Sequence, residues 1–100
     1  MARIDAILTR SPRRLGRLFT AAEWSYCTER RFGAQHLAAR LAAKRAAHRL
    51  GVPGRFVDLE IRRDDRGAPA LFAHDGPLPW LLSLSHDGDL AVALLVGAAA

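Results

Sequence analysis

The stretch Leu37-Ala38-Ala39-Arg40-Leu41-Ala42-Ala43-Lys44-Arg45-Ala46 decides the fold, because it forms the centre of the longest helix that the sequence predicts. That helix runs over residues 34–50. Its leucines form an apolar stripe, and its alanines allow a neighbouring element to approach closely. Gly51 ends the helix and Pro53 prevents it from resuming.

Shorter helical segments are expected before this helix. Residues 4–8 have apolar side chains at helical spacing, and Ser11-Pro12 is typical of a renewed helix start. Thr20-Ala21-Ala22-Glu23 is a capping box, in which a threonine and a glutamate satisfy each other's free backbone N–H groups. It predicts a helix that reaches to about Arg30.

After Gly51 the apolar period changes from helical to alternating. Residues 56–63 and 80–86 alternate between apolar and polar, which predicts two strands, and a short strand is expected at 70–72. Residues 73–79 are predicted to be a loop. Asp87-Gly88 indicates a hairpin, and the strand at 90–96 is apolar on both faces, which is typical of a central strand.

This order, helices first and then an antiparallel meander, predicts an α+β fold with N-terminal helices packed on an antiparallel β-sheet. The length of 100 residues fits one domain, which we place at 1–97 with a short tail at 98–100. The apolar run at 90–96 is too short to span a bilayer and no signal peptide is visible, so we expect a cytoplasmic protein without a membrane segment.

The net charge of +5 favours an anionic partner: a nucleotide, a nucleic acid or an acidic protein. All basic residues except Lys44 are arginines, whose planar forks suit phosphate and carboxylate. A codon bias that enriches arginine and alanine together is the alternative explanation. Cys27 is the single cysteine, so no internal disulfide can form, and we expect it to be a buried apolar residue.

The long helix carries a row of positive charge. Arg40, Lys44 and His48 share one face, and Arg45 and Arg49 form the adjacent row. Like charges at this spacing destabilise a helix by about 0.2–0.5 kcal/mol per pair. This destabilisation of the helix is explained either by an anion that binds to the row of positive charges or by a long helix face that lies in solvent.

The segment Leu82-Ser83-Leu84-Ser85-His86-Asp87 closes a predicted strand. Ser85 and His86 are adjacent and point to opposite faces, so a triad with Asp87 is not expected. His86 is the best candidate for a general acid or base, because a histidine titrates near neutral pH. The alternative is a histidine whose hydrogen bonds are satisfied by the hairpin turn.

A second basic stripe is predicted on the early helix, where the spacing places four arginines on one face: Arg10, Arg13, Arg14 and Arg17. The stripe could receive an acidic protein or nucleic-acid phosphates. It has no interleaved aromatic residues and no helix-turn-helix signature, which argues against nucleic acid. The sequence also contains no zinc-ligand spacing and no glycine-rich phosphate loop, so no metal site is predicted.

Three stretches in this order carry a family resemblance: residues 37–46, then Gly67-Ala68-Pro69, then residues 82–86. The chain resembles the holo-acyl-carrier-protein synthase type of 4′-phosphopantetheinyl transferase. Members of that family typically read L-A-x-R-[FW]-A-x-K-E-A, then G-x-P, then S-x-S-H. Phe19-Thr20-Ala21-Ala22-Glu23 matches a further segment, F-T-x-x-E, and the resemblance covers nearly the whole chain.

The resemblance implies a reaction in which phosphopantetheine passes from coenzyme A to a serine of an acyl carrier protein. It implies that residues of the three motifs lie beside coenzyme A, namely Arg40, Lys44, Arg45, Pro69, Ser83, Ser85 and His86. It also implies that the stripe of Arg10, Arg13, Arg14 and Arg17 receives the acidic recognition helix of the carrier protein. Members of this type commonly assemble as trimers, so a homo-oligomer is expected.

The chain departs from the family pattern at two places. Arg45 replaces the glutamate of K-E-A, which is a magnesium ligand in the family, and the first β-strand with its G-x-D aspartate is missing from the pattern. Asp5 is the carboxylate nearest to it in the sequence. Arg45 could mark the loss of magnesium, or its guanidinium could clamp phosphate oxygens in place of the ion, or it could face solvent.

These departures argue against magnesium-dependent transfer. Our first hypothesis is therefore a divergent member, repurposed to bind or act on a substrate linked to a carrier protein or to phosphopantetheine, with His86, Asp87 or Asp5 as acid–base groups. One alternative is an active 4′-phosphopantetheinyl transferase that uses an unusual site. Another is a non-catalytic partner of an intact paralogue.

Overall fold

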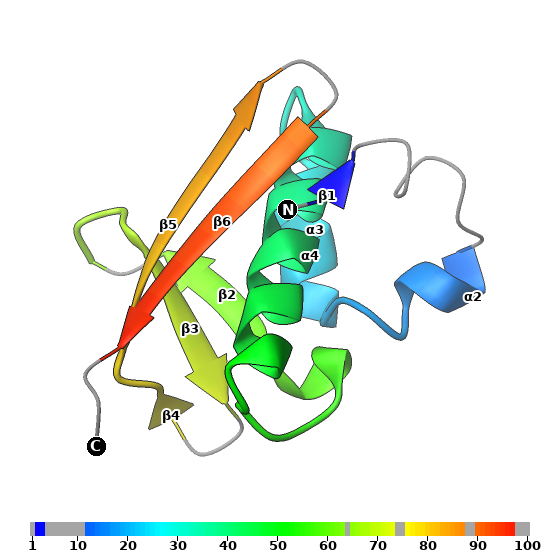
Figure 1. Ribbon diagram of the computed structural model, residues 1–100. Helices are drawn as coiled ribbons and strands as arrows, with labels where there is room; N and C mark the ends of the chain where they lie inside the picture. Colours follow the sequence, from blue (N-terminus) through cyan, green and yellow to red (C-terminus); the bar gives the residue numbers. More distant parts are fainter. Residues whose placement is uncertain (1, 4–11, 64, 74–75, 88–89, 98–100) are drawn as a thin grey trace.

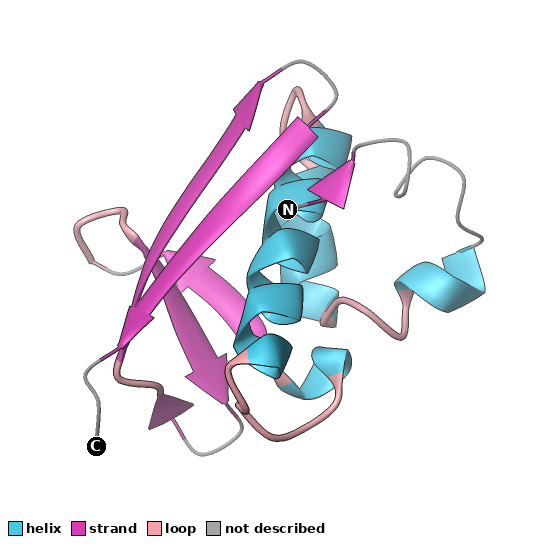
Figure 2. Ribbon diagram, in the orientation of Figure 1, coloured by secondary structure: helices cyan, strands magenta, loops and turns pink. Residues whose placement is uncertain are grey.

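The computed structural model of the chain describes residues 2–3, 12–63, 65–73, 76–87 and 90–97. The helices gather beside the strands, and α4 runs along the β5–β6 pair (Figures 1 and 2). The helical elements are α2 (Pro12–Leu15), α3 (Ala21–Thr28), α4 (Gly33–Arg49) and the 3₁₀ turn η1 (Phe56–Asp58). The strands are β1 (Ala2–Arg3), β2 (Glu60–Arg63), β3 (Pro69–Ala73), β4 (Gly76–Pro77), β5 (Trp80–Asp87) and β6 (Leu90–Gly97).

The strands form two antiparallel three-stranded sheets, with the orders β1-β6-β5 and β2-β3-β4. The β5–β6 hairpin is the longest pairing and extends from Trp80 opposite Gly97 to Asp87 opposite Leu90. β1 pairs with the start of β6, where Ala2 lies opposite Ala91 and Arg3 opposite Leu90. The predicted α+β class with helices packed on antiparallel strands is confirmed, although the strands are divided between two sheets.

The predicted ends of the two main helices follow from local chemistry. Thr20 caps α3: its hydroxyl accepts the Glu23 N–H at 3.1 Å, and the Glu23 carboxylate accepts the Thr20 N–H at 2.9 Å. Gly51 follows α4 with φ of +86°, a conformation that glycine adopts without strain. Between the helices, a Cβ at Gly33 would lie 2.8 Å from the Cys27 carbonyl oxygen, so glycine lets α3 and α4 approach there.

The structure differs from the predicted local structure at three places. Residues 56–58 form a 3₁₀ turn rather than the start of a strand, because the Asp58 carboxylate accepts the Arg55 backbone N–H at 2.8 Å and tightens the chain. Gly76–Pro77 pairs with β3 inside the predicted loop. Ala2–Arg3 is a short strand that was not predicted, while the helix predicted at residues 4–8 lies outside the described residues.

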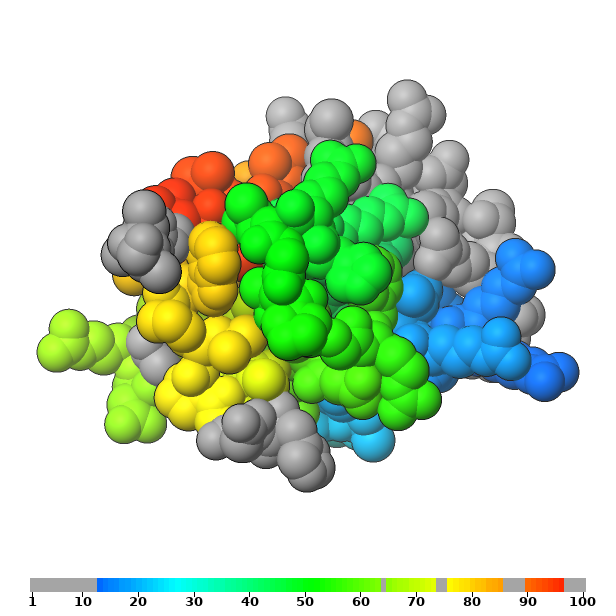
Figure 3. Space-filling view, turned by 60° about the horizontal axis from the view of Figure 1, so that its bottom comes forward, coloured from blue at the N-terminus to red at the C-terminus, as the bar shows by residue number. Residues whose placement is uncertain are grey.

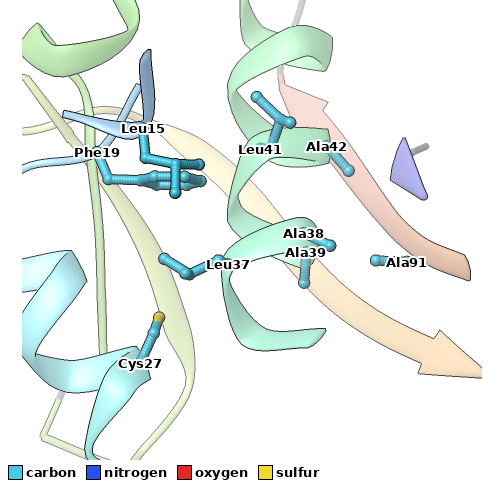
Figure 4. Close-up of a cluster of buried hydrophobic side chains, with 9 residues drawn as sticks. All are labelled: Leu15, Phe19, Cys27, Leu37, Ala38, Ala39, Leu41, Ala42 and Ala91. Carbon is cyan, nitrogen blue, oxygen red and sulfur yellow. The ribbon is translucent and has the colours of Figure 1, made fainter. Parts of the chain in front are cut away.

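The core lies where α4 meets the strands. Ala38, Ala39 and Ala42 of α4 face Ala91 of β6, and their small side chains allow the close approach that the sequence predicted (Figure 4). Larger side chains fill the α3 side of this cluster: Leu15, Phe19, Cys27, Leu37 and Leu41. A second cluster lies against the C-terminal half of α4 and contains Ala43, Ala47, Val52, Leu59, Ile61 and Leu71.

The prediction that the strand at 90–96 is central is confirmed, but only one of its two apolar faces is covered. β6 is the middle strand of its sheet, and its Ala91 is buried against α4. The opposite face is not covered, because Val92, Leu94 and Val96 are exposed. Leu81, which lies opposite Val96 on β5, is 75% exposed and extends this apolar face.

Candidate functional site

A buried ion pair joins Lys44 of α4 to Glu23 of α3. Both side chains are fully buried, and the Lys44 ammonium also donates to the Leu18 carbonyl oxygen at 2.6 Å. The second carboxylate oxygen of Glu23 accepts the Ile61 N–H of β2 at 3.0 Å. Burial lowers the pKa of Lys44, and the charge and hydrogen bond of Glu23 oppose this shift. This network therefore ties α3, α4 and β2 together.

The geometry does not support the predicted contact between Lys44 and a bound phosphate. Its ammonium points into the interior and is bonded to protein oxygens, so an incoming ligand cannot reach it in this arrangement. We assign Lys44 a structural role instead. The motif spacing identified the residue but did not show which face of the helix is buried.

A cavity of about 290 Å³ lies between the N-terminal half of α4, the end of β5 and Arg63 of β2. Its lining residues are His36, Ala39, Arg40, Arg63, Leu84 and Ser85. Arg40 and Ser85 were predicted site residues, and the structure brings them together here. The remaining polar residues, His36 and Arg63, were not predicted.

Arg40 is the least exposed cation in this cavity, with 2% of its surface accessible. Its Nη1 donates to the His36 carbonyl oxygen in a long contact of 3.4 Å, and its guanidinium lies 4.7 Å from the centre of the Tyr26 ring. Within the described part of the chain, its Nε has no hydrogen-bond partner. A buried donor without a partner costs free energy, which an anion in the cavity would recover.

Tyr26 connects Arg40 to two further arginines. The Arg30 guanidinium lies 3.4 Å from the centre of the ring, and Arg63 Nε donates to the phenol oxygen at 3.2 Å. Burial raises the pKa of this phenol, but the hydrogen bond from Arg63 and the charges of Arg63 and Arg30 outweigh it, so the pKa is lowered. We define the arginine pocket as the cavity residues Arg40, Arg63 and Ser85 with the adjoining Tyr26 and Arg30, and its three arginines make it electropositive.

The Gly67-Ala68-Pro69 turn contributes to the arginine pocket indirectly. Gly67 has φ of +83°, and its carbonyl oxygen accepts a hydrogen bond from Nη1 of Arg63 at 3.0 Å. Pro69 starts β3 opposite Arg63 and is not a lining residue of the cavity. The turn thus positions an arginine, while the implied contact of Pro69 with a nucleotide stays a prediction.

The pKa of Tyr26 provides a test of the arginine pocket. Tyr26 is the only tyrosine in the chain, so its titration can be followed by tyrosinate absorbance without overlap. We expect a midpoint below the ordinary value of 10.0, and we expect Arg63→Gln or added inorganic phosphate to raise it, because each reduces the positive charge at the phenol. Arg31→Gln is the matched control, since Arg31 lies over Phe32 instead. An equal midpoint in Arg63→Gln and the parent chain would contradict this assignment.

Arg45 lines a different cavity. This cavity has a volume of about 430 Å³ and is lined by Arg45, Ala46, Arg49 and Leu50 of α4 and by Ala93, Leu94 and Leu95 of β6. The structure therefore does not place Arg45 beside Arg40, and a joint clamp on one phosphate within a single chain is not supported.

The residues around Arg45 do not fit the magnesium ion that the family resemblance implies. A guanidinium is a cation without an acceptor group, and two of them line this cavity. Among the residues that the structure describes, no group of three His, Cys, Asp or Glu side chains could hold a metal ion.

Other predicted site residues are only partly described. Ser83 is exposed on β5 opposite Leu94 and lies outside the arginine pocket. His86 and Asp87 belong to β5, where they pair with Ala91 and Leu90, but their side chains lie outside the described part. Asp5 also lies outside it, so all three acid–base assignments stay predictions.

The basic stripe is short in the structure. Arg13 and Arg14 are exposed on α2, Arg17 is exposed in the turn that follows, and Arg10 lies outside the described residues. α2 projects from the body of the molecule (Figure 3). A cavity of about 510 Å³ lies beside it and is lined by Leu15, Gly16, Phe19, Thr20, Ala21, Trp24 and Ser25.

Cys27 is buried, as predicted for an apolar residue. Burial raises the pKa of its thiol to about 11, and the nearby charge of Arg40 only partly offsets this. Because the thiolate is the reactive form, this cysteine is not a nucleophile at neutral pH. In the described part of the chain, no helix is both long and apolar enough to cross a membrane.

Fold and pocket together define a small α+β protein with a buried arginine in a cavity between α4 and β5. The chain is 42% identical to a holo-[acyl-carrier-protein] synthase of Geotalea daltonii, in an alignment over 82% of this chain and 77% of that protein. It is similar in structure to the holo-[acyl-carrier-protein] synthase of Neisseria meningitidis, with a TM-score of 0.79, 24% identity and coverage of 98% and 93% of the two chains. The Helicobacter pylori synthase, solved in complex with coenzyme A, gives a TM-score of 0.75 at 22% identity, over 96% of this chain and 94% of that one.

No family model matches the chain. The relationship to the Geotalea protein nevertheless extends over most of both sequences. The chain therefore belongs to the holo-acyl-carrier-protein synthase family, within the 4′-phosphopantetheinyl transferase superfamily.

Proposed function

We propose that this chain is a 4′-phosphopantetheinyl transferase that moves phosphopantetheine from coenzyme A to a serine of an acyl carrier protein. The relatives support this alternative better than our first hypothesis of a repurposed member. The observation that carries the proposal is the arginine pocket, which Ser85 and Arg63 line together with the buried Arg40, whose Nε has no hydrogen-bond partner among the described residues. Such donors suit the phosphate groups of coenzyme A.

In the proposed reaction, the carrier-protein serine oxygen attacks the β-phosphorus of coenzyme A. A new phosphorus–oxygen bond forms, the bond to 3′,5′-ADP breaks, and the serine proton passes to a base. Arg40, Arg63 and the Ser85 hydroxyl would hold phosphate oxygens and stabilise their charge. His86 of β5 stays the candidate for this base, because it closes the S-x-S-H motif of the family.

The carrier protein is proposed to dock on α2 and the turn after it. The exposed Arg13, Arg14 and Arg17 lie next to the largely apolar cavity that contains Trp24. An acidic amphipathic helix would match both features, because arginines pair with its carboxylates and the cavity accepts an apolar side chain.

Mass spectrometry of an acyl carrier protein incubated with the chain and coenzyme A tests the proposed reaction. We expect the mass of phosphopantetheine to be added to the carrier serine, with release of 3′,5′-ADP. A carrier protein with this serine replaced by alanine is the control and should gain no mass. An unchanged mass of the native carrier protein, over a range of magnesium concentrations, would exclude the transferase function.

Arg45 favours a second candidate, a member that has lost magnesium-dependent transfer. The same assay separates the two candidates through Arg45→Glu, which restores the family carboxylate. If transfer has been lost through this residue, Arg45→Glu should gain loading in the presence of magnesium. If the parent chain already loads the carrier protein, the first candidate holds.

We further propose that copies of the chain assemble through the exposed face of the β5–β6 hairpin, as a trimer by family resemblance. Val92, Leu94 and Val96, with Leu81 opposite, form an apolar surface of the kind that oligomers bury. We expect Leu94→Glu to shift the sedimentation coefficient toward a smaller species, because a buried charge without a partner is costly. Arg66→Glu, on an exposed turn, should leave it unchanged, and an equal shift in both variants would contradict this interface.

A further inference from the structure

Three polar residues that line the cavity between α4 and β5 contact a single side chain, that of Tyr26. Arg63 Nε donates to the phenol oxygen at 3.2 Å, and the Arg40 guanidinium lies 4.7 Å from the ring centre. The His36 ring meets the Tyr26 ring edge-on, with 6.4 Å between the two ring centres. Tyr26 itself is not among the described lining residues. It therefore affects a ligand in this cavity through the residues that it contacts.

The Tyr26 hydroxyl holds an arginine that would otherwise sample many conformations. Arg63 is exposed at the end of β2, and ordering a long exposed side chain when a ligand binds costs free energy. Here its Nε is bonded to Tyr26 and its Nη1 to the Gly67 carbonyl oxygen. Two nitrogens of the guanidinium are therefore fixed before a ligand arrives, and the tyrosine supplies one of the two bonds.

The Tyr26 ring allows two further cations to lie close together. The guanidinium groups of Arg30 and Arg40 lie 3.4 Å and 4.7 Å from its centre. Cations that share one ring repel each other, and the negative face of the ring offsets part of this repulsion. Arg30 is fixed further, because its Nη1 donates to the backbone carbonyl oxygen of Tyr26 at 2.7 Å. The ring thus stabilises the cluster of cations before an anion is bound.

We propose that Tyr26 is a positioning residue for anion binding in the arginine pocket, with its hydroxyl setting Arg63 and its ring setting Arg40. The inference rests on the proposed function, because the anion would be a phosphate group of coenzyme A. Tyr26 also packs against the core cluster beside α4, so a purely structural role is the alternative. The two roles differ in one respect: positioning acts through particular arginines, whereas a structural role does not.

Titration calorimetry with 3′,5′-ADP, and with inorganic phosphate as the smallest anion, tests the proposal. Tyr26→Phe removes the hydroxyl and keeps the ring. We expect it to lower the affinity for 3′,5′-ADP about 2- to 12-fold, the effect of having to order one long side chain on binding. Tyr26→Leu also removes the ring and should lower the affinity further. Phe72→Leu is the matched control and should leave the affinity unchanged, because it removes a ring 4.5 Å from the Arg62 guanidinium, outside the arginine pocket.

A double-mutant cycle separates positioning from a structural role. Because Tyr26→Phe acts through Arg63, it should change the affinity little in an Arg63→Gln background, whereas Tyr26→Leu should still lower it through Arg40. Additive effects of Tyr26→Phe and Arg63→Gln would overturn the proposal. An unchanged affinity in Tyr26→Phe, or a parent chain that binds neither anion, would also overturn it. If Tyr26→Leu does not fold, the cycle with Tyr26→Phe decides alone.

Loading of the carrier protein is a separate measurement, so the inference and the proposed function can fail independently. A chain that binds 3′,5′-ADP with the expected pattern but loads no carrier protein would refute the transferase function and support the role of Tyr26. A chain that loads the carrier protein, with the same KM for coenzyme A in Tyr26→Phe and in the parent, would overturn the role of Tyr26 alone.

Discussion

Replacing Glu23 with leucine is expected to lower the free energy of unfolding by about 3–5 kcal/mol, because it leaves the Lys44 ammonium buried without its counter-ion. The Ile61 and Thr20 N–H groups would also lose their acceptor. Small domains are typically stable by only about 5–15 kcal/mol, so the loss is a large fraction of the total. Urea denaturation followed by circular dichroism measures it.

The double variant Glu23→Leu with Lys44→Met is the control for this ion pair. It removes both charges, so we expect it to be more stable than Glu23→Leu alone. The lowered pKa of Lys44 adds a dependence on pH. Between that pKa and the ordinary value of 10.5, the unfolded chain binds more protons, so this group makes stability rise with pH, and Lys44→Met should remove that slope. A change below about 1 kcal/mol for Glu23→Leu would fall in the range of exposed pairs and would refute the buried pair.

Arg40→Met is expected to have the largest effect on transfer to the carrier protein. Hydrogen bonds to charged groups contribute about 1.5–3 kcal/mol, which corresponds to a loss of about 10- to 150-fold in affinity for 3′,5′-ADP or in kcat/KM. The reason is that the guanidinium is buried and its Nε has no hydrogen-bond partner among the described residues, so a bound phosphate would gain this donor. Titration calorimetry with 3′,5′-ADP and the mass assay measure the two quantities.

Arg31→Met is the matched control for Arg40→Met, because it removes an exposed arginine from outside the arginine pocket. Thermal melts of both variants would separate a loss of folding from a loss of binding. Unchanged affinity for 3′,5′-ADP in a folded Arg40→Met variant would show that the phosphate lies elsewhere. Arg40→Lys keeps the positive charge but loses the planar guanidinium that can donate two parallel hydrogen bonds to one phosphate. We therefore expect its affinity for 3′,5′-ADP to lie between those of the parent chain and Arg40→Met.

The fold could be predicted mainly where local chemistry decides it. The capping box at Thr20, the glycine after α4 and the alternation along β5 each depend on near neighbours, and all three predictions are confirmed. The 3₁₀ turn at residues 56–58 was missed, because the bond between Asp58 and the Arg55 N–H competes with the alternating pattern. Local propensity does not decide such a competition.

The candidate site could be predicted less well, because it depends on which helix faces are buried. The motif spacing grouped Arg40, Lys44 and Arg45, yet the structure places them in the arginine pocket, in the interior and in a second cavity between α4 and β6, respectively. Tyr26 and Arg63 were missed because 37 positions separate them in the chain. One signal was available, since Tyr26 follows Glu23 by three residues and so shares the face of α3 that meets α4.

The burial of Lys44 gives this protein an unusual chemical handle. It is the only lysine of the chain, and its amine is sealed in the folded state. A lysine-specific protease therefore has a single cleavage point, which opens only when α3 and α4 separate. With protease in excess, so that cleavage is faster than reclosing, the appearance of its two fragments would report the rate of that separation, with no label attached to the molecule.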